Sequence, residues 1–251
     1  MGVPVIGCRC EVCTSPNPRN KRLRTSALLE VGGLNVLFDA GPDLRQQALA
    51  AGLARVDAVL LTHAHVDHIA GLDDLRPLNF AQKAAIPLYG MQPTLKFVRK
   101  HFDYAFSEGS EGSTRPSLKL VEIHDSTLFQ VGSVTIVPFN VYHGTWTITG
   151  FRIGGLGYVT DASAIPPESL AHLHGLDLLV LNALRQQPHP THFSLEQALE
   201  QIEILKPRRA LLVHMTHDME HQAINATLPE HVRLAFDGQI VEIEGQEYVS
   251  M

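Results

Sequence analysis

Long apolar runs and clusters of like charge are scarce in this 251-residue sequence. No segment reaches the roughly 18 consecutive apolar residues of a membrane-spanning helix, so the sequence predicts no membrane partner. Its start, MGVPVIGCRC, lacks the apolar stretch and cleavage site of a secretory signal. A formal charge of -6 without any Lys/Arg run argues against nucleic acid as a partner. We therefore expect a cytoplasmic protein.

Periodic and low-complexity segments are also missing. The 19 glycines and 15 prolines are scattered without a period, which excludes collagen-like structure, and 45% of the residues are hydrophobic, which excludes disorder as the main state. No linker rich in Pro, Gly or Ser divides the chain. We therefore expect one domain over residues 1–251. Residues 107–117 predict a surface loop, either a plain connection or a mobile lid.

Short strand patterns alternate with helical ones along the chain. Strands are predicted at 26–31, 34–39, 57–61, 86–90, 118–123, 133–139, 146–153, 156–160, 177–181, 210–214 and 239–243. Helices are predicted at 43–51, 93–101, 166–173 and 195–205. Asp43 is expected to cap the first helix, and Ser194 with Gln197 forms a capping box for the last. This order predicts an α/β protein in which helices cover sheets.

Histidine is abundant, with 14 residues, and several lie directly after the buried strand pattern at 57–61. His63, His65, Asp67 and His68 fall within six residues, and an irregular loop there could direct all four side chains toward two adjacent cations. Imidazole and carboxylate together suit zinc, iron or manganese. The alternative is a histidine-rich surface loop that binds nothing.

Three further candidates follow strand patterns elsewhere. His143, Asp161 and His214 each come where an apolar strand ends. Alone, each would more often be a capping or surface residue. Together they share one pattern, because active sites collect at the strand ends of open sheets.

The three cysteines, Cys8, Cys10 and Cys13, lie within six residues of one another. An odd, tightly clustered set is a poor disulfide framework and suits a metal clip within residues 1–20. The alternatives are three free thiols, or a local disulfide with one thiol remaining.

The sequence HAHVDH at 63–68, followed by His143, Asp161 and His214, resembles the metallo-β-lactamase superfamily over nearly the whole chain. The resemblance implies a four-layer αββα sandwich with two divalent metal ions, zinc or manganese, at one edge. One ion would be bound by His63, His65 and His143, the second by Asp67, His68 and His214, with Asp161 bridging. Asp39 matches an acidic residue that orients a ligand.

Two features resemble the phosphodiesterase branch of the superfamily, which includes phosphoribosyl cyclic phosphate phosphodiesterases and ribonuclease Z. His192, two residues before a helix cap, matches a histidine that contacts phosphate and protonates the leaving alcohol; the alternative is a residue that bonds backbone. The resemblance thus assigns Asp67 and His192 to catalysis. The other feature is a structural zinc site, bound by Cys8, Cys10, Cys13 and His217, although His221 is also near in sequence.

The predicted function is therefore metal-dependent hydrolysis of a small phosphodiester, such as a phosphoribosyl cyclic phosphate, with a homodimer as the expected assembly. Three alternatives remain: a lactonase or thioesterase on the same metals, a non-hydrolytic binding or carrier protein, and a protein with structural zinc alone. Arg76 could bind a substrate phosphate, or form a surface ion pair with Asp73 or Asp74. Two family features are not found: a first strand before Gly2 and the basic arm with which ribonuclease Z binds transfer RNA.

Overall fold

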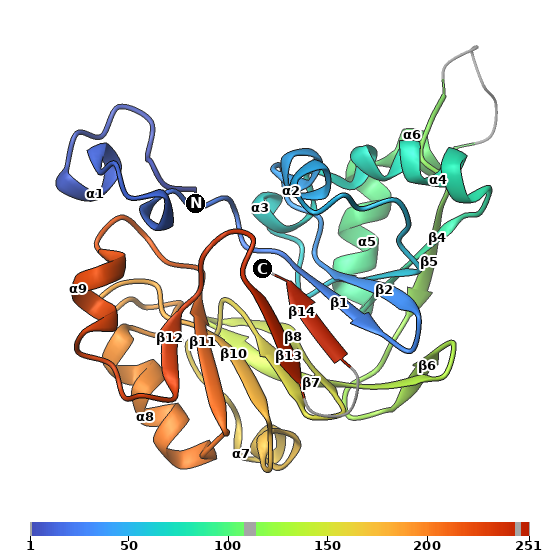
Figure 1. Ribbon diagram of the computed structural model, residues 1–251. Helices are drawn as coiled ribbons and strands as arrows, with labels where there is room; N and C mark the ends of the chain where they lie inside the picture. Colours follow the sequence, from blue (N-terminus) through green and yellow to red (C-terminus); the bar gives the residue numbers. More distant parts are fainter. Residues whose placement is uncertain (1, 108–113, 244–246, 251) are drawn as a thin grey trace.

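Two seven-stranded sheets form the centre of the protein (Figure 1). The computed structural model describes residues 2–107, 114–243 and 247–250, so positions 108–113 of the predicted loop lie outside the described residues. The first sheet has the strand order β13 (Ile240–Ile243), β14 (Glu247–Ser250), β1 (Ala27–Val31), β2 (Leu34–Phe38), β3 (Ala58–Leu60), β4 (Ile86–Gly90), β5 (Leu118–Glu122). The second has the order β12 (Val232–Leu234), β11 (Arg209–Val213), β10 (Leu178–Asn182), β9 (Leu156–Val159), β8 (Trp146–Ile153), β7 (Val134–His143), β6 (Phe129–Val131).

The inner faces of the sheets share one apolar core. Leu29 and Phe38 of the first sheet pack in the same cluster as Phe151, Tyr158 and Val180 of the second. The Phe38 and Tyr158 rings stack with centroids 4.2 Å apart. Successive side chains of a strand point to opposite faces of the sheet. The apolar residues between those of the shared core therefore lie on the outer faces.

Helices cover both outer faces. On the first sheet lie α2 (Leu44–Ala50), α3 (Val66–Ile69) and α5 (Gln92–His101), whose apolar residues join one outer cluster. On the second sheet lie α8 (Leu195–Leu205) and α9 (His221–Asn225). Helix α8 has the predicted bounds and the capping box of Ser194 and Gln197. Together these layers confirm the predicted αββα sandwich.

The remaining helices are short. They are α1 (Glu11–Thr14), α4 (Arg76–Gln82), α6 (Asp103–Phe106) and α7 (Pro167–Leu170), with 3-10 turns at Pro18–Asn20, Leu72–Leu75 and Ala171–Leu173. None of the helices within the described residues is long and apolar enough to cross a bilayer.

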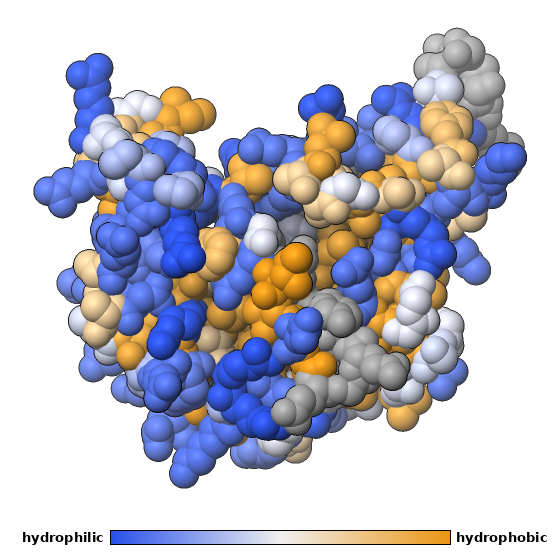
Figure 2. All heavy atoms as spheres, viewed as in Figure 1, coloured by the Kyte–Doolittle hydropathy of each residue, from blue (hydrophilic) through white to orange (hydrophobic). Residues whose placement is uncertain are grey.

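Residues 2–22 form an arm that carries α1 and projects beside the carboxyl ends of β11 and β12 (Figure 1). It has a small cluster of its own, with Val3, Val12 and Cys13 buried. Arg22 anchors the arm by donating to the carbonyls of Thr216 and Met219. In the space-filling view the surface is hollowed between this arm and the helices over the first sheet (Figure 2).

The expected cap of the first helix is wrong. Asp43 does not cap α2; its carboxylate accepts from the backbone N–H and the guanidinium of Arg24 instead. At the edge of the first sheet, β14 pairs antiparallel with β1, with Leu28 opposite Ser250. Strands that lie far apart in sequence are thus neighbours in this sheet.

Candidate metal centre

The candidate site lies at the carboxyl ends of strands from both sheets. Asp39 follows β2, His63 follows β3, Asp161 follows β9 and His214 follows β11, while His143 is the last residue of β7. Ligands of α/β sheets characteristically bind at these strand ends. The backbone of Thr149 in β8 donates to the carbonyl of Thr62 at 2.9 Å, which ties the two sheets together below the site.

Three of these strand ends have a left-handed backbone. Asp39, Asp161 and His214 have φ angles of 57°, 58° and 54°. Non-glycine residues seldom adopt this region, and such residues cluster at functional sites, where the surrounding structure enforces them. The same left-handed turn thus follows three strands, and each time it turns an Asp or His side chain toward the candidate site.

The motif at 63–68 is only partly the irregular loop that the sequence predicts. His63 and His65 lie in a loop, but α3 begins at Val66, so Asp67 and His68 belong to a single helical turn. A single helix would spread all four side chains around its circumference, but here only two of them are helical.

The first group of candidate ligands consists of His63, His65 and His143, whose ligand atoms lie within 4.8 Å of one another. His63 Nε2 is 2.9 Å from His65 Nδ1. Burial lowers the pKa of His63 well below its usual value, so its ring is neutral at pH 7, as a metal ligand must be.

Neighbouring oxygen atoms select the tautomers of these rings. His143 Nδ1 lies 2.6 Å from the carbonyl of Thr191, which can only accept, so Nδ1 carries the proton and Nε2 keeps its lone pair. The Thr62 hydroxyl donates to Asp39 Oδ2 at 2.7 Å and therefore accepts from His63 Nδ1 at 3.0 Å. Both Nε2 atoms are thus left as acceptors for a cation.

The second group consists of Asp67, His68 and His214. His68 Nδ1 donates to Asp39 Oδ2 at 2.7 Å, as expected for the orienting role of Asp39. The predicted bridging residue, Asp161, lies between the groups: Oδ2 is 3.2 Å from His68 Nε2, and Oδ1 is 3.1 Å from His214 Nε2. Both predicted sets of ligands are therefore brought together around one buried carboxylate.

The spacing of these atoms fits tetrahedral cations. Ligand atoms about 2.0–2.1 Å from a zinc ion lie about 3.3–3.4 Å apart at tetrahedral angles. The separations here between His63 and His65, His68 and Asp161, and Asp161 and His214 run from 2.9 to 3.2 Å. His68 Nε2 is buried, makes no hydrogen bond of good geometry and lies 3.2 Å from Asp161 Oδ2, an arrangement that leaves room for a cation to bind both atoms.

The charges around His68 also call for a cation. Burial opposes a charge on His68, but the carboxylates of Asp161 and Asp39 outweigh it and raise its pKa well above the usual value. Burial likewise opposes ionisation of Asp161, yet His214 and His68 lower its pKa well below the usual range. Asp161 is therefore ionised at pH 7 and needs positive charge beside it, which a proton or a divalent cation supplies.

His192 lies in the same cluster. Its Nε2 is 3.0 Å from Asp161 Oδ1, and its Nδ1 is 2.9 Å from the Thr191 hydroxyl and 3.2 Å from His189 Nδ1. Both ring nitrogens thus contact side chains, which does not match the alternative of a histidine that bonds backbone at the start of α8. His189 is its neighbour and was not among the candidates predicted from the sequence. Its position three residues before His192 could have indicated this contact.

Gly41 and Gly71 allow the segment 63–71, which carries four candidate ligands, to lie close to the loop after β2. A Cβ on Gly41 would lie 2.3 Å from the carbonyl oxygen of Asp67, and one on Gly71 would lie 2.0 Å from that of Gly41. The Ala40 N–H donates to the carbonyl of His68 at 2.7 Å. No side chain fits between these backbones, so the approach sets the position of Asp67 and His68.

Gly41→Ala is expected to weaken metal binding at the Asp67 and His68 group by about 10- to 100-fold, the usual cost of disturbing the support of a ligand. The added methyl must displace the Asp67 backbone, whereas His63, His65 and His143 stay in place. Metal titration of the purified variant measures the change. Gly90→Ala is the matched control, because the atoms nearest to its Cβ belong to side chains, Leu95 Cδ2 at 3.1 Å and Leu61 Cβ at 3.5 Å, and not to the backbone. If Gly41→Ala bound metal ions at both groups with the wild-type affinities, this account would be contradicted.

The cysteines form a second cluster with His217. Its Nδ1 lies 3.2 Å from Cys8 Sγ, 3.4 Å from Cys10 Sγ and 3.4 Å from Cys13 Sγ. A tetrahedral zinc with S and N ligands at about 2.3 and 2.0 Å would separate them by about 3.5 Å. A backbone hydrogen bond from Cys13 lowers the pKa of Cys10 to about 7, toward the thiolate form of a ligand. His221 is not in the cluster; it packs on Phe236.

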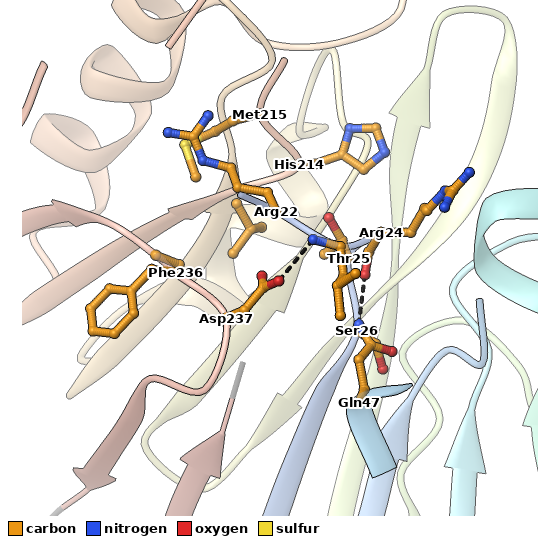
Figure 3. Close-up of a pocket in the computed structure, with 12 residues that line it drawn as sticks. Arg22, Arg24, Thr25, Ser26, Gln47, His214, Met215, Phe236 and Asp237 are labelled. Carbon is orange, nitrogen blue, oxygen red and sulfur yellow. Dashed lines mark hydrogen bonds between the residues drawn. The ribbon is translucent and has the colours of Figure 1, made fainter. Parts of the chain in front are cut away.

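A small cavity of about 40 Å³ lies beside His214, where the arm joins the sheets (Figure 3). The Leu23 N–H donates to Asp237 Oδ2 at 2.9 Å, and Gln47 donates to the carbonyl of Arg24 at 2.8 Å. The chain that connects the cysteine cluster to β1 therefore runs directly past a candidate metal ligand.

Arg76 makes the contacts expected of a surface ion pair, which the sequence left open as the alternative to binding a substrate phosphate. Its guanidinium is 3.5 Å from Asp73 Oδ2 and donates to the carbonyl of Thr114 at 3.0 Å. Tyr104 donates to the same carboxylate at 2.8 Å. Asp73 thus gives Arg76 an ion-pair partner outside the metal centre.

Comparison with known proteins agrees with this geometry. Residues 34–215 match the family described as the beta-lactamase superfamily domain. Among solved structures, a diphosphatase from the PhnP family superimposes with a TM-score of 0.90 at 39% identity, covering 97% of this chain and 94% of that one. The matched family range contains every candidate active-site residue from Asp39 to His214, whereas the cysteine cluster and His217 lie outside it.

Two curated relatives differ in length from the chain. It is 39% identical over 240 residues to the octanoyltransferase of Porphyromonas gingivalis (strain ATCC BAA-308 / W83), covering 94% of the chain but 48% of that protein. The chain thus spans about half the length of this relative. It is 33% identical over 190 residues to the ribonuclease Z of Mycobacterium bovis (strain BCG / Pasteur 1173P2), covering 68% of each.

Proposed function

Since this chain belongs to the beta-lactamase superfamily domain family, we propose that it is a phosphodiesterase that uses two divalent metal ions to hydrolyse a small phosphodiester. The observation that supports phosphorus chemistry most directly is His192, with Nε2 3.0 Å from the carboxylate between the two ligand groups. A phosphodiester with an alcohol leaving group needs a proton donor at this point. A small cyclic phosphodiester, such as a phosphoribosyl cyclic phosphate, is the substrate class we propose first.

The proposed ligands follow the two groups of the site. His63, His65 and His143 would hold one zinc or manganese ion, and Asp67, His68 and His214 would hold the other, with Asp161 between the two groups. Two cations bound there supply a nucleophile near neutral pH and positive charge beside the phosphoryl oxygens. The protein contributes a fixed arrangement: Asp39 and Thr62 orient the rings, and burial excludes water from His63, His68 and Asp161.

His192 acts as the proton donor in this proposal. Thr191 Oγ1 lies 2.9 Å from its Nδ1, which orients the ring so that Nε2 faces the site. A proton on Nε2 passes to the oxygen of the departing alcohol, which would otherwise leave as a strongly basic alkoxide. Asp161 Oδ1, 3.0 Å from Nε2, holds the ring on the side of the site where the alcohol would leave.

A diphosphate is the second candidate substrate. The solved structure at 39% identity is described as a diphosphatase, and its P–O–P linkage is likewise a phosphoryl group with two substituents. Phosphate is a weaker base than an alkoxide, so its departure needs less help from His192. Dependence on His192 therefore distinguishes the two candidates.

A side-by-side assay of the zinc- or manganese-loaded protein tests the function. It compares a ribose cyclic phosphate, a dinucleoside diphosphate, a bis-aryl phosphodiester, a lactone and a thioester. A preference of 100-fold or more for the phosphorus substrates, about 2.7 kcal/mol, is expected. Faster turnover of the lactone or thioester would overturn the proposal in favour of a carboxylic-ester hydrolase. Metal binding without turnover of any substrate would instead indicate a binding or carrier protein.

We also propose that Cys8, Cys10, Cys13 and His217 bind a structural zinc that fixes the arm against the segment after β11. Cys10→Ser and His217→Ala are each expected to lower the zinc content by one equivalent per chain, because a closed tetrahedral site tolerates no missing ligand. Elemental analysis of the purified variants measures this loss. His221→Ala, which alters a histidine outside the cluster, is the matched control and should keep the full zinc content.

A further inference from the structure

Trp146, the single tryptophan of the chain, stands at the rim of the metal centre with 49% of its surface exposed. One side of its indole packs on the candidate ligand His65, with ring centroids 4.8 Å apart and a tilt of 34°. Tryptophan is enriched where proteins contact ligands and partners, because its large apolar ring also carries a polar N–H. Neither the metals nor the proton donor of the proposed function uses this ring.

Strand pairing places Trp146 on the same face as the metal ligands. His143 and Trp146 are directly opposite each other across the hairpin of β7 and β8. Side chains of directly opposed residues lie on the same face of a sheet, so the indole and the His143 ring leave the hairpin on one side. The other face of the indole, away from His65, is therefore presented to whatever approaches the metals.

The hairpin that carries Trp146 is anchored on three sides. The N–H of Gly144 donates to Ser163 Oγ at 2.9 Å, and the backbones of Tyr142 and Ala164 are bonded at 2.9 Å. Gly144 has a φ of 59°, and a Cβ there would lie 2.8 Å from Thr191 Cγ2. The backbone that carries the indole is therefore held in place, so binding of a ligand need not order the hairpin.

Ring contacts also place Trp146 apart from the proton donor. Trp146 contacts His65, His65 contacts His143 at 5.0 Å, and His143 contacts His192 at 4.6 Å. His192 serves the leaving oxygen, and two rings intervene between it and the indole. The part of the substrate that reaches Trp146 is therefore the group that stays on phosphorus.

We propose that Trp146 is a specificity-determining residue that stacks on a planar aromatic ring, of the size of a nucleobase, in the retained group of the substrate. The proposal rests on the proposed phosphodiesterase activity, and within that activity it favours a phosphodiester that carries a nucleobase over a phosphoribosyl cyclic phosphate, which carries none. Aromatic stacking of a base contributes about five- to 150-fold in affinity. A methyl or sugar group alone would forgo this contact.

Two esters with the same leaving group test the proposal. Thymidine 5′-(4-nitrophenyl) phosphate and methyl 4-nitrophenyl phosphate differ only in the retained group. We expect Trp146→Ala to raise KM for the thymidine ester by about five- to 150-fold, with kcat nearly unchanged and no effect on the methyl ester. Trp146→Phe should restore most of the affinity. Leu128→Ala, at a residue 63% exposed near the other end of β7, is the control.

A binding measurement separates this inference from the proposed function. Because Trp146 is the single tryptophan, the fluorescence of the zinc-loaded protein reports on it directly. Thymidine 5′-monophosphate should quench it saturably, and deoxyribose 5-phosphate should not. If neither ester is hydrolysed but the quench occurs, the activity is wrong and the aromatic subsite stands. Absence of the quench, or equal loss on both esters in Trp146→Ala, would show that the indole only supports His65 and would overturn the inference.

Discussion

Asp161→Asn is expected to lower kcat/KM by at least about 10³-fold, which corresponds to about 4 kcal/mol of transition-state stabilisation. The carboxylate is buried, and its oxygens lie within 3.0–3.2 Å of His68, His192 and His214. Asparagine has the same shape but no charge, and its amide nitrogen would face imidazole nitrogens that are themselves candidate metal ligands. Both the proposed cations and the protonated His192 would then lose the negative charge between them.

Kinetics and metal content together measure this effect. The variant should bind the second ion at least tenfold more weakly, as expected when a buried, charged ligand is removed. Asp57→Asn is the matched control, because Asp57 pairs with Arg55 at 3.0 Å just before β3, at the opposite end of that strand from His63. If Asp161→Asn kept wild-type turnover with both ions bound, Asp161 would not bridge them and the proposed arrangement would be wrong.

Much of the candidate site could be predicted because its signals are local. An apolar strand followed by His or Asp places a side chain at a sheet edge whatever the rest of the chain does, and this pattern identified His143, Asp161 and His214. The helix over 195–205 was equally predictable, since its cap, apolar face and end all lie within the segment. Each of these features depends on residues close together in sequence.

The features that sequence reasoning missed depend on contacts between distant residues. Strand β14 exists because β1, more than 200 residues earlier, offers an unpaired edge. Asp43 does not cap α2 because its carboxylate accepts a hydrogen bond from Arg24 instead. The role inferred for Trp146 follows from its register with His143 and its contact with His65, and neither can be read from the chain alone.

His192→Ala is expected to leave both groups of metal ligands intact and to lower kcat by about 10²- to 10⁴-fold on substrates with alkyl leaving groups. The ring contacts Asp161 but belongs to neither proposed set of ligands, so the metal content should stay at the wild-type value. An alkoxide must be protonated as it leaves, and removal of the imidazole removes the donor nearest to Asp161. A 4-nitrophenolate leaves without a proton, so the same variant should lose less than about tenfold on an aryl ester.

A series of phosphodiesters with leaving groups of increasing pKa separates this role from a structural one. In the wild type, log kcat should depend weakly on leaving-group pKa, because the proton is transferred in the transition state; in His192→Ala the slope should steepen. His189→Ala is the matched control, since it removes the neighbouring ring 3.2 Å from His192 Nδ1 without removing the proposed donor. Equal losses on aryl and alkyl esters would show that His192 only supports the carboxylate of Asp161. The preference for phosphodiesters over lactones and thioesters would then need another explanation, although the metal ligands would be unaffected.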